Sequence, residues 1–144
     1  MPKDAPDHRD AELMLRVYEL RREPVMRESR SALAAQFWPK SYEDILAIMK
    51  PDHPQNAAFR QVTSYWEMVY GFARHGIVNA DFWIENNSEG LFLLAKIAPY
   101  LERLRSDYSP TSLRSSEWIA TECGEGRRIY GLVLARVQKV LDCR

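Results

Sequence analysis

The sequence FRQVTSYWEMVYGFARHGI, residues 59–77, contains more apolar surface than a helix at the edge of a domain needs. Its apolar and aromatic residues recur at intervals of three and four, the spacing that brings side chains to one face of a helix. With the preceding residue they form two adjacent rows, which are Ala58, Val62, Tyr65, Val69 and Phe72, and Phe59, Trp66, Tyr70 and Ala73. Because two rows make a wide apolar face, the pattern predicts a central helix that other helices contact from more than one side.

Small residues form a third row on the same helix. Ala57, Ser64 and Gly71 are spaced one heptad apart, and small side chains allow a neighbouring helix to approach closely. This row is therefore the predicted position of the closest helix contact. At the end of the stretch, His75-Gly76 predicts a helix that ends in a glycine cap with a left-handed backbone.

The sequence before this helix predicts a tail followed by further helices. Residues 1–9 hold two prolines and four charged residues and are predicted to be a disordered tail, after which Asp10 is predicted to cap the first helix. Pro24 leaves two possibilities open, a kink in that helix or two shorter helices that abut. Ser41 predicts the start of a short helix.

The sequence after the central helix is also helical in pattern. Asn79 predicts a helix start, and poor helix formers at residues 86–90 leave open whether the helix that follows is continuous or broken there. No internal repeat and no sustained strand-like alternation is found. The predicted fold class is therefore all-α, an antiparallel helical bundle of about four main helices plus short helices, with residues 10–144 forming a single domain.

Several motifs resemble those of a known family. They are YELRREP at residues 18–24, RxVTSYWxM at residues 60–68, the His75-Gly76 pair and Ala95-Lys96-Ile97. In these motifs the chain resembles a family of short, uncharacterised bacterial helical proteins, grouped as a domain of unknown function, over about residues 13–105. The resemblance implies an all-helical fold, and it implies no activity, substrate or cofactor.

Charge and composition exclude several classes of function. Lys plus Arg and Asp plus Glu number 20 each, and without a basic block no nucleic-acid partner is expected. The N-terminal sequence is charged where a signal peptide is apolar, and the apolar run at residues 91–100 is interrupted by Lys96 and Pro99, so neither export nor membrane insertion is expected. Cys123 and Cys143 lack Cys-x-x-Cys spacing, so we expect reduced thiols in a cytoplasmic protein.

Residue types suited to catalysis are present without the spacing that catalysis requires. Helical bundles with di-iron sites use Glu-x-x-His pairs, which this sequence lacks, and the three histidines lie in the tail, before a proline and at a helix end. No serine lies in a Gly-x-Ser-x-Gly motif. Cys123 lies close to Glu122 and Glu125, which would raise the pKa of its thiol. The sequence therefore predicts no catalytic residue, no metal ligand and no cofactor.

One polar edge of the central helix is a candidate binding site. Arg60, Ser64 and Glu67 share one side of this helix by their spacing, and a covered Glu67 would need a cation or hydrogen-bond donors. The favoured interpretation is a buried ion-pair network plus a capped helix start, with Arg21, Arg22, Arg27 and Lys96 as the available cations, and the other is a polar ligand pocket. In the second interpretation the ligand-binding residues are Arg60, Ser64, Glu67, Asn86, Glu89 and Lys96.

Aromatic residues suggest a different mode of action. Phe37 and Trp38 follow one helix, and Trp83 lies next to a helix cap, so these three side chains are the ones expected at an exterior interaction surface. The leading hypothesis is a binding or interaction module that acts by self-association or through a protein partner. The alternative is a helical domain that binds a small ligand in the polar pocket described above, and an enzyme is the third choice.

Overall fold

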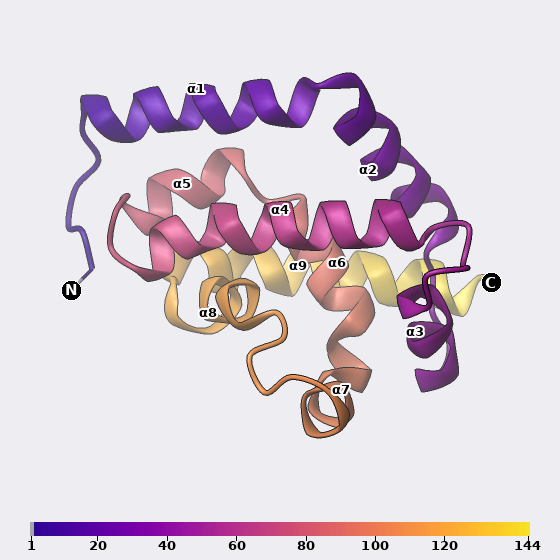
Figure 1. Ribbon diagram of the computed structural model, residues 1–144. Helices are drawn as coiled ribbons and strands as arrows, with labels where there is room; N and C mark the ends of the chain where they lie inside the picture. Colours follow the sequence, from indigo (N-terminus) through magenta and orange to yellow (C-terminus); the bar gives the residue numbers. More distant parts are fainter. Residues whose placement is uncertain (1) are drawn as a thin grey trace.

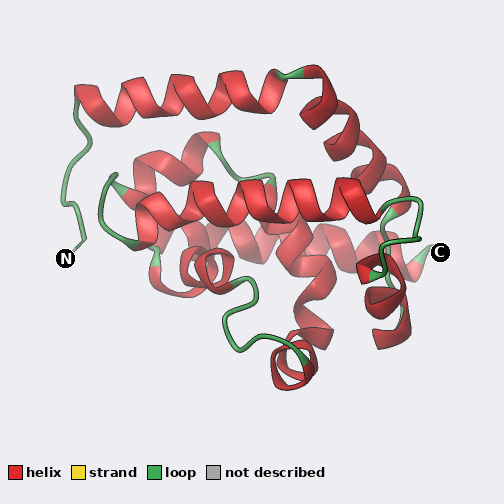
Figure 2. Cartoon of the chain, viewed as in Figure 1, coloured by secondary structure: helices red, strands yellow, loops and turns green. Residues whose placement is uncertain are grey.

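The structure is a computed structural model that describes residues 2–144, and every regular element in this range is a helix (Figures 1 and 2). The elements are α1 (His8–Arg22), α2 (Pro24–Gln36), α3 (Tyr42–Met49), α4 (Asn56–Arg74), α5 (Ala80–Asn86), α6 (Gly90–Ile97), the 3₁₀ helix η1 (Ala98–Tyr100), α7 (Leu101–Asp107), α8 (Arg114–Glu122) and α9 (Gly124–Asp142). The predicted all-α class is confirmed.

The helix predicted to be central, α4, lies in the middle of the bundle (Figure 1). α2 and α8 pack closely on α4, and α9 packs on α5, α6 and α8. α1, α4 and α9 run side to side across Figure 1, with the chain direction of α4 opposite to that of the other two, whereas α2 and α6 cross them steeply. α4 is thus contacted from more than one side, as its two apolar rows predict.

Burial along α4 matches the predicted rows. Seven of the nine predicted apolar positions are buried, and Ala58 and Phe72 are half-buried against the same core. The helix ends as predicted: Gly76 has a φ of 71°, its N–H donates to the Ala73 carbonyl at 3.0 Å, and the Ile77 N–H donates to the Phe72 carbonyl at 2.9 Å. This pair of bonds is the Schellman arrangement, which satisfies carbonyls at the end of the helix.

The predicted row of closest contact on α4 is wrong. Ala57 and Ser64 are exposed, and an added Cβ at Gly71 would lie 3.8 Å from a serine hydroxyl of α8, an ordinary contact distance. The start of α8 bonds to Glu67, in the C-terminal half of α4, whereas Ala57 and Ser64 are exposed to solvent. A much tighter approach to α4 occurs at Gly90, at the start of α6, where an added Cβ would lie 2.7 Å from buried aromatic side chains of α4.

The N-terminal segment lies against the domain. Asp7, and not the predicted Asp10, caps α1 by accepting from the N–H groups of residues 9 and 10 at 3.0 and 3.1 Å. Asp10 is fully buried, and it binds Lys3 Nζ at 2.6 Å and the Asn79 N–H at 2.9 Å. The disorder predicted for residues 1–9 stays a prediction, and the part that concerns Met1 lies outside the described residues.

The helical chain is broken both at Pro24 and at residues 86–90, the two places where the sequence left continuity open. α1 ends at Arg22, and the Glu23 carboxylate caps α2 by accepting from the N–H groups of residues 25 and 26 at 3.1 and 2.9 Å. Pro24 occupies the first turn of α2, where the N–H that proline lacks would have no helical partner. Further along, α5 ends at Asn86 and α6 begins at Gly90.

Asn87 fills the break between α5 and α6 as a buried polar residue with partners on several helices. Its Oδ1 accepts from Arg21 Nη1 at 2.7 Å, and its Nδ2 donates to the Trp83 carbonyl at 2.9 Å. Its backbone carbonyl accepts from the Tyr70 hydroxyl at 2.7 Å. Since only 1% of Asn87 is exposed, these bonds form in a water-poor environment and fix the start of α6 relative to α1 and α4.

Candidate functional site

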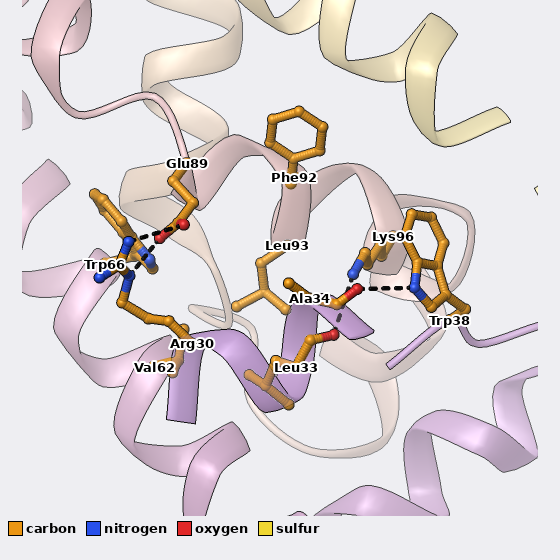
Figure 3. A pocket seen from close by; sticks show the side chains of 10 residues that line it. All are labelled: Arg30, Leu33, Ala34, Trp38, Val62, Trp66, Glu89, Phe92, Leu93 and Lys96. Carbon is orange, nitrogen blue, oxygen red and sulfur yellow. Dashed lines mark hydrogen bonds and ion pairs between the residues drawn. The ribbon is translucent and has the colours of Figure 1, made fainter. Parts of the chain in front are cut away.

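A pocket of about 330 Å³ lies between α2, α4 and α6 (Figure 3). Positions 30, 33 and 34 come from α2, positions 62 and 66 from α4, and positions 89, 92, 93 and 96 from α6 and the residue before it. Each set follows helical spacing, so each helix turns one stripe toward the same space. The lining residues are Arg30, Leu33, Ala34, Trp38, Val62, Trp66, Glu89, Phe92, Leu93 and Lys96.

One end of the pocket is closed by an ion pair. Arg30 Nε and Nη2 donate to the two carboxylate oxygens of Glu89 at 2.6 and 3.0 Å, a bidentate arrangement. Arg30 Nη1 also donates to the Arg21 carbonyl at 3.0 Å. The hydrogen bonds to Glu89 raise the pKa of the Arg30 guanidinium. The positive charge of Arg30 is thus neutralised locally, at a position where Glu89 remains exposed to solvent.

The other end of the pocket holds Lys96, a buried lysine (Figure 3). Only 6% of this residue is exposed, and its Nζ lies 4.0 Å from the centre of the Trp38 ring. The ammonium donates to the Leu33 carbonyl at 3.3 Å, and no ion pair in residues 2–144 includes it. Burial, followed by repulsion from the nearby Arg144 guanidinium, lowers the pKa of Lys96 to about 8. A titratable group in a pocket whose pKa is strongly perturbed is a candidate for a functional residue.

The six residues predicted to bind a ligand do not converge on one site. Glu89 and Lys96 line the pocket between α2, α4 and α6, whereas Ser64 and Glu67 line a separate depression next to α8. Arg60 and Asn86 are exposed and line neither. The polar edge of α4 does not reach the pocket. The pocket is lined by Val62 and Trp66, which lie on a different side of α4 from Arg60, Ser64 and Glu67.

Glu67 accepts hydrogen bonds from the start of α8, a helix that the sequence did not identify as its partner. Its Oε1 accepts from the Ser115 N–H at 2.9 Å, and its Oε2 accepts from the Ser116 N–H at 2.8 Å and from the Ser116 hydroxyl at 2.5 Å. The first residues of α8 follow Leu113, which has a left-handed φ of 54° and provides no side-chain cap. Of the two kinds of partner expected for Glu67, the arginine or lysine is wrong, whereas hydrogen-bond donors are found: the N–H groups and the positive dipole end of α8 stabilise the carboxylate.

We expect Glu67→Ala to lower the free energy of unfolding by about 0.5–2 kcal/mol, the range measured for lost helix caps. The change would leave two N–H groups at the start of α8 without their acceptor. Denaturant unfolding of the purified protein measures this effect. The matched control is Glu85→Ala, which removes an exposed carboxylate from α5 and should change stability by less than about 0.5 kcal/mol. Equal effects of the two substitutions would show that Glu67 does not stabilise α8.

Two of the three aromatic residues expected at an exterior surface are buried, so that expectation is wrong for them. Trp83 is fully buried, and its Nε1 donates to the Val69 carbonyl of α4 at 2.8 Å. Phe37 is 5% exposed and packs against Phe59, with ring centres 5.5 Å apart. Trp38 is half-buried and lines the pocket. The position of Trp83 beside a helix cap gave no indication that its indole would find an acceptor on another helix.

Arg30 and Leu33 were not identified as pocket residues from the sequence, although their spacing follows a helical pattern. Residues 30, 33 and 34 in α2 and residues 89, 92, 93 and 96 in α6 have the same helical spacing, with charges at the ends of apolar stripes. Each stripe alone is typical of an ordinary core-facing helix. Only the packing of α2 and α6 against the same part of α4 combines the two stripes into one pocket.

Cys123 is the N-cap of α9 and is buried. Its Sγ accepts from the Gly126 N–H at 3.4 Å and donates to Asp81 Oδ1 at 3.3 Å. Burial, with a further contribution from Asp81, raises the pKa of the Cys123 thiol to about 11. The predicted direction is confirmed, whereas the cause is burial and Asp81 in place of the neighbouring glutamates. Within residues 2–144, no group of three or more His, Cys, Asp and Glu side chains could hold a metal ion.

Fold and site together define the class of protein, an all-α bundle whose central helix forms one wall of an apolar pocket. The chain belongs to the family of DUF4760, a domain of unknown function, whose model matches residues 6–123. The resemblance to an uncharacterised helical family is thereby confirmed, and its bacterial origin stays a prediction. Curated proteins and solved structures gave no match. None of the helices in the described range has the length and apolar character needed to cross a membrane.

Proposed function

We propose that this protein reversibly binds a small, largely apolar molecule in the pocket between α2, α4 and α6. The observation that carries the proposal is the pocket itself, about 330 Å³ in volume, with seven apolar side chains among its ten lining residues. Sites for small molecules in proteins are typically concave, mostly apolar and equipped with a few polar groups. This pocket lies at Glu89 and Lys96, and not at the polar edge of Arg60 and Glu67.

The chemistry of the lining favours binding over catalysis. Arg30 and Glu89 are paired with each other, which leaves Lys96 as the charged group that faces the pocket alone. A lowered pKa can activate a lysine as a nucleophile, but the proton transfers of catalysis still need a general acid or base beside it. The neighbours of Lys96 Nζ are a carbonyl oxygen, the Trp38 ring and the Phe37 ring. These groups can hold an ammonium, and they cannot take up its proton.

The hypothesis of an interaction module that acts by self-association or through a protein partner stays a prediction, as does the cytoplasmic location. The interaction-module hypothesis has less support because Phe37 and Trp83, two of the three residues expected at its surface, are buried. Trp38 contributes to the pocket wall, and its position favours a ligand site as much as a protein interface.

The proposal can be tested with N-phenyl-1-naphthylamine, a neutral apolar fluorophore. We expect saturable binding with a stoichiometry of one, and we expect Ala34→Phe to weaken it at least about tenfold by filling the pocket. Ala34 lines the pocket and is exposed, so a larger side chain there should occupy the pocket mouth without disrupting the core. Fluorescence titration measures the dissociation constant of the fluorophore.

The matched control is Ala35→Phe, which adds the same side chain to the next residue of α2. Ala35 is exposed and does not line this pocket, so its substitution should leave the affinity unchanged. The proposal fails if the fluorophore shows no saturable binding, or if the two variants weaken binding equally.

A further inference from the structure

We propose that the ligand is an apolar carboxylate, which lies with its anionic group at Lys96 and its apolar part along Phe92 and Leu93. This inference rests on the proposed function and adds to it the chemical class and the orientation of the ligand.

The two ends of the pocket differ in their unsatisfied charge. At one end Arg30 is held by both oxygens of Glu89, so an incoming anion would have to displace an existing carboxylate. At the other end Lys96 has a carbonyl and an aromatic ring as partners, and neither carries a full negative charge. An anion should therefore bind more favourably at Lys96, because it would supply the counter-charge that the buried ammonium lacks.

A second cation increases the positive potential at this end. The Arg144 guanidinium lies 5.1 Å from the centre of the same Trp38 ring, and the Arg144 carbonyl accepts from Lys40 Nζ at 2.5 Å. No ion pair in residues 2–144 includes Arg144 or Lys40. Burial and, after it, repulsion from the Arg144 guanidinium on the same indole ring lower the pKa of Lys96. A bound carboxylate would relieve this repulsion.

Lys96 also has hydrogen-bonding capacity left for a ligand. An ammonium has three N–H donors, and the structure assigns one of them to the Leu33 carbonyl. A carboxylate oxygen in the pocket could accept a further one without breaking that bond. A neutral head group could accept a bond from the ammonium but would bring no negative charge, and a cationic head group would be repelled by Lys96.

The spacing of the pocket residues fits a ligand with an elongated apolar part. Glu89 and Lys96 lie at the two ends of the α6 stripe, about 10 Å apart along the helix axis at a rise of about 1.5 Å per residue. Phe92 and Leu93 lie between them along the helix (Figure 3), and both residues line the pocket. A ligand anchored at Lys96 would therefore cover both apolar side chains before it reached the Arg30–Glu89 pair.

The inference is tested by comparing octanoate, 1-octanol and octylamine as competitors of N-phenyl-1-naphthylamine. These three molecules share one apolar chain and differ in head-group charge. We expect octanoate to bind at least about tenfold more tightly than 1-octanol, and octylamine to bind most weakly, because only the carboxylate brings a counter-charge to the buried ammonium. In Lys96→Met the advantage of octanoate should disappear while 1-octanol still binds.

Retained binding of 1-octanol shows that the variant is folded and that its pocket is intact. Lys50→Met is the matched control, because it removes an exposed lysine outside the pocket and changes the net charge equally. If octanoate and 1-octanol bind equally, or if Lys96→Met keeps the preference, the carboxylate assignment is overturned while the apolar pocket stands. If the fluorophore and all three competitors fail to bind, the proposed function and this inference fall together.

Discussion

Gly126→Ala should lower the free energy of unfolding by about 3 kcal/mol or more, the scale of a backbone-level clash in a packed interior. Gly126 is buried in the first turn of α9, directly against the end of α8. An added Cβ would overlap the Ile119 carbonyl oxygen and lie 2.9 Å from the carbonyl carbon. These are backbone atoms of α8, so the clash cannot be relieved by a side-chain rotation. Cys123 alone separates α8 from α9, and the sharp corner between the two helices requires glycine at position 126.

Gly131→Ala provides a control within the same helix. An added Cβ at Gly131 would meet no other part of the protein within 4 Å, apart from the adjacent residues of its own helix. Replacing an unhindered helical glycine by alanine should stabilise the protein by about 0.5–1 kcal/mol. Thermal and denaturant unfolding of both variants measure the two effects. A Gly126→Ala protein as stable as the wild type would mean that α8 and α9 do not meet as closely as the structure shows.

Lys96→Met should raise the free energy of unfolding by about 2 kcal/mol at pH 7. The pKa of Lys96 falls from the usual 10.5 to about 8 on folding, and each unit corresponds to about 1.4 kcal/mol of disfavoured charge. The loss of the bond to Leu33 and of the contact with Trp38 offsets about 1 kcal/mol of the gain. The Leu33 carbonyl keeps its bond from the Phe37 N–H at 3.0 Å, so no acceptor is left unsatisfied.

The same substitution has a defined pH dependence. Between pH of about 8 and 10.5 the unfolded chain still holds the Lys96 proton and the folded protein has released it. Unfolding then takes up a proton, so the stability contributed by this residue rises with pH across that window. The advantage of Lys96→Met should therefore be constant below a pH of about 8 and shrink above it.

Denaturant unfolding at a series of pH values measures both predictions for Lys96. Lys50→Met, which removes an exposed lysine, should change stability little and without this pH dependence. A Lys96→Met protein that is less stable at pH 7, or whose advantage does not change up to pH 10.5, would show that the buried ammonium carries no energetic cost. A residue that costs stability in the free protein is typical of a position retained for function.

The sequence was sufficient to predict the features that depend on neighbouring residues along the chain. The two apolar rows of α4, the cap at Asn79 and the left-handed Gly76 all arise from local spacing and backbone preference. The fold class followed because the helical pattern is continuous over most of the chain. The alternatives at Pro24 and at residues 86–90 were also correctly identified, although the sequence could not choose between a kink and a break.

The features that the sequence did not reveal depend on how helices are rotated and placed relative to one another. Spacing placed Glu67 on one side of α4, but it could not show that the start of α8 would lie there. In the same way, Trp83 is buried because a carbonyl of α4 accepts its N–H, which is a contact between separate helices. The pocket was found only in part, through Glu89 and Lys96, because its other wall belongs to α2.

The contact between Glu67 and α8 also bears on how the protein folds. α8 has no capping side chain of its own at its first residues, and the acceptor that replaces it lies almost fifty residues earlier in the chain, on α4. A helix of this length is marginal in isolation. The first turn of α8 is therefore stabilised only once α4 has formed, which makes the two helices one cooperative unit. The bonds between them also add long-range contacts to an otherwise local helical topology.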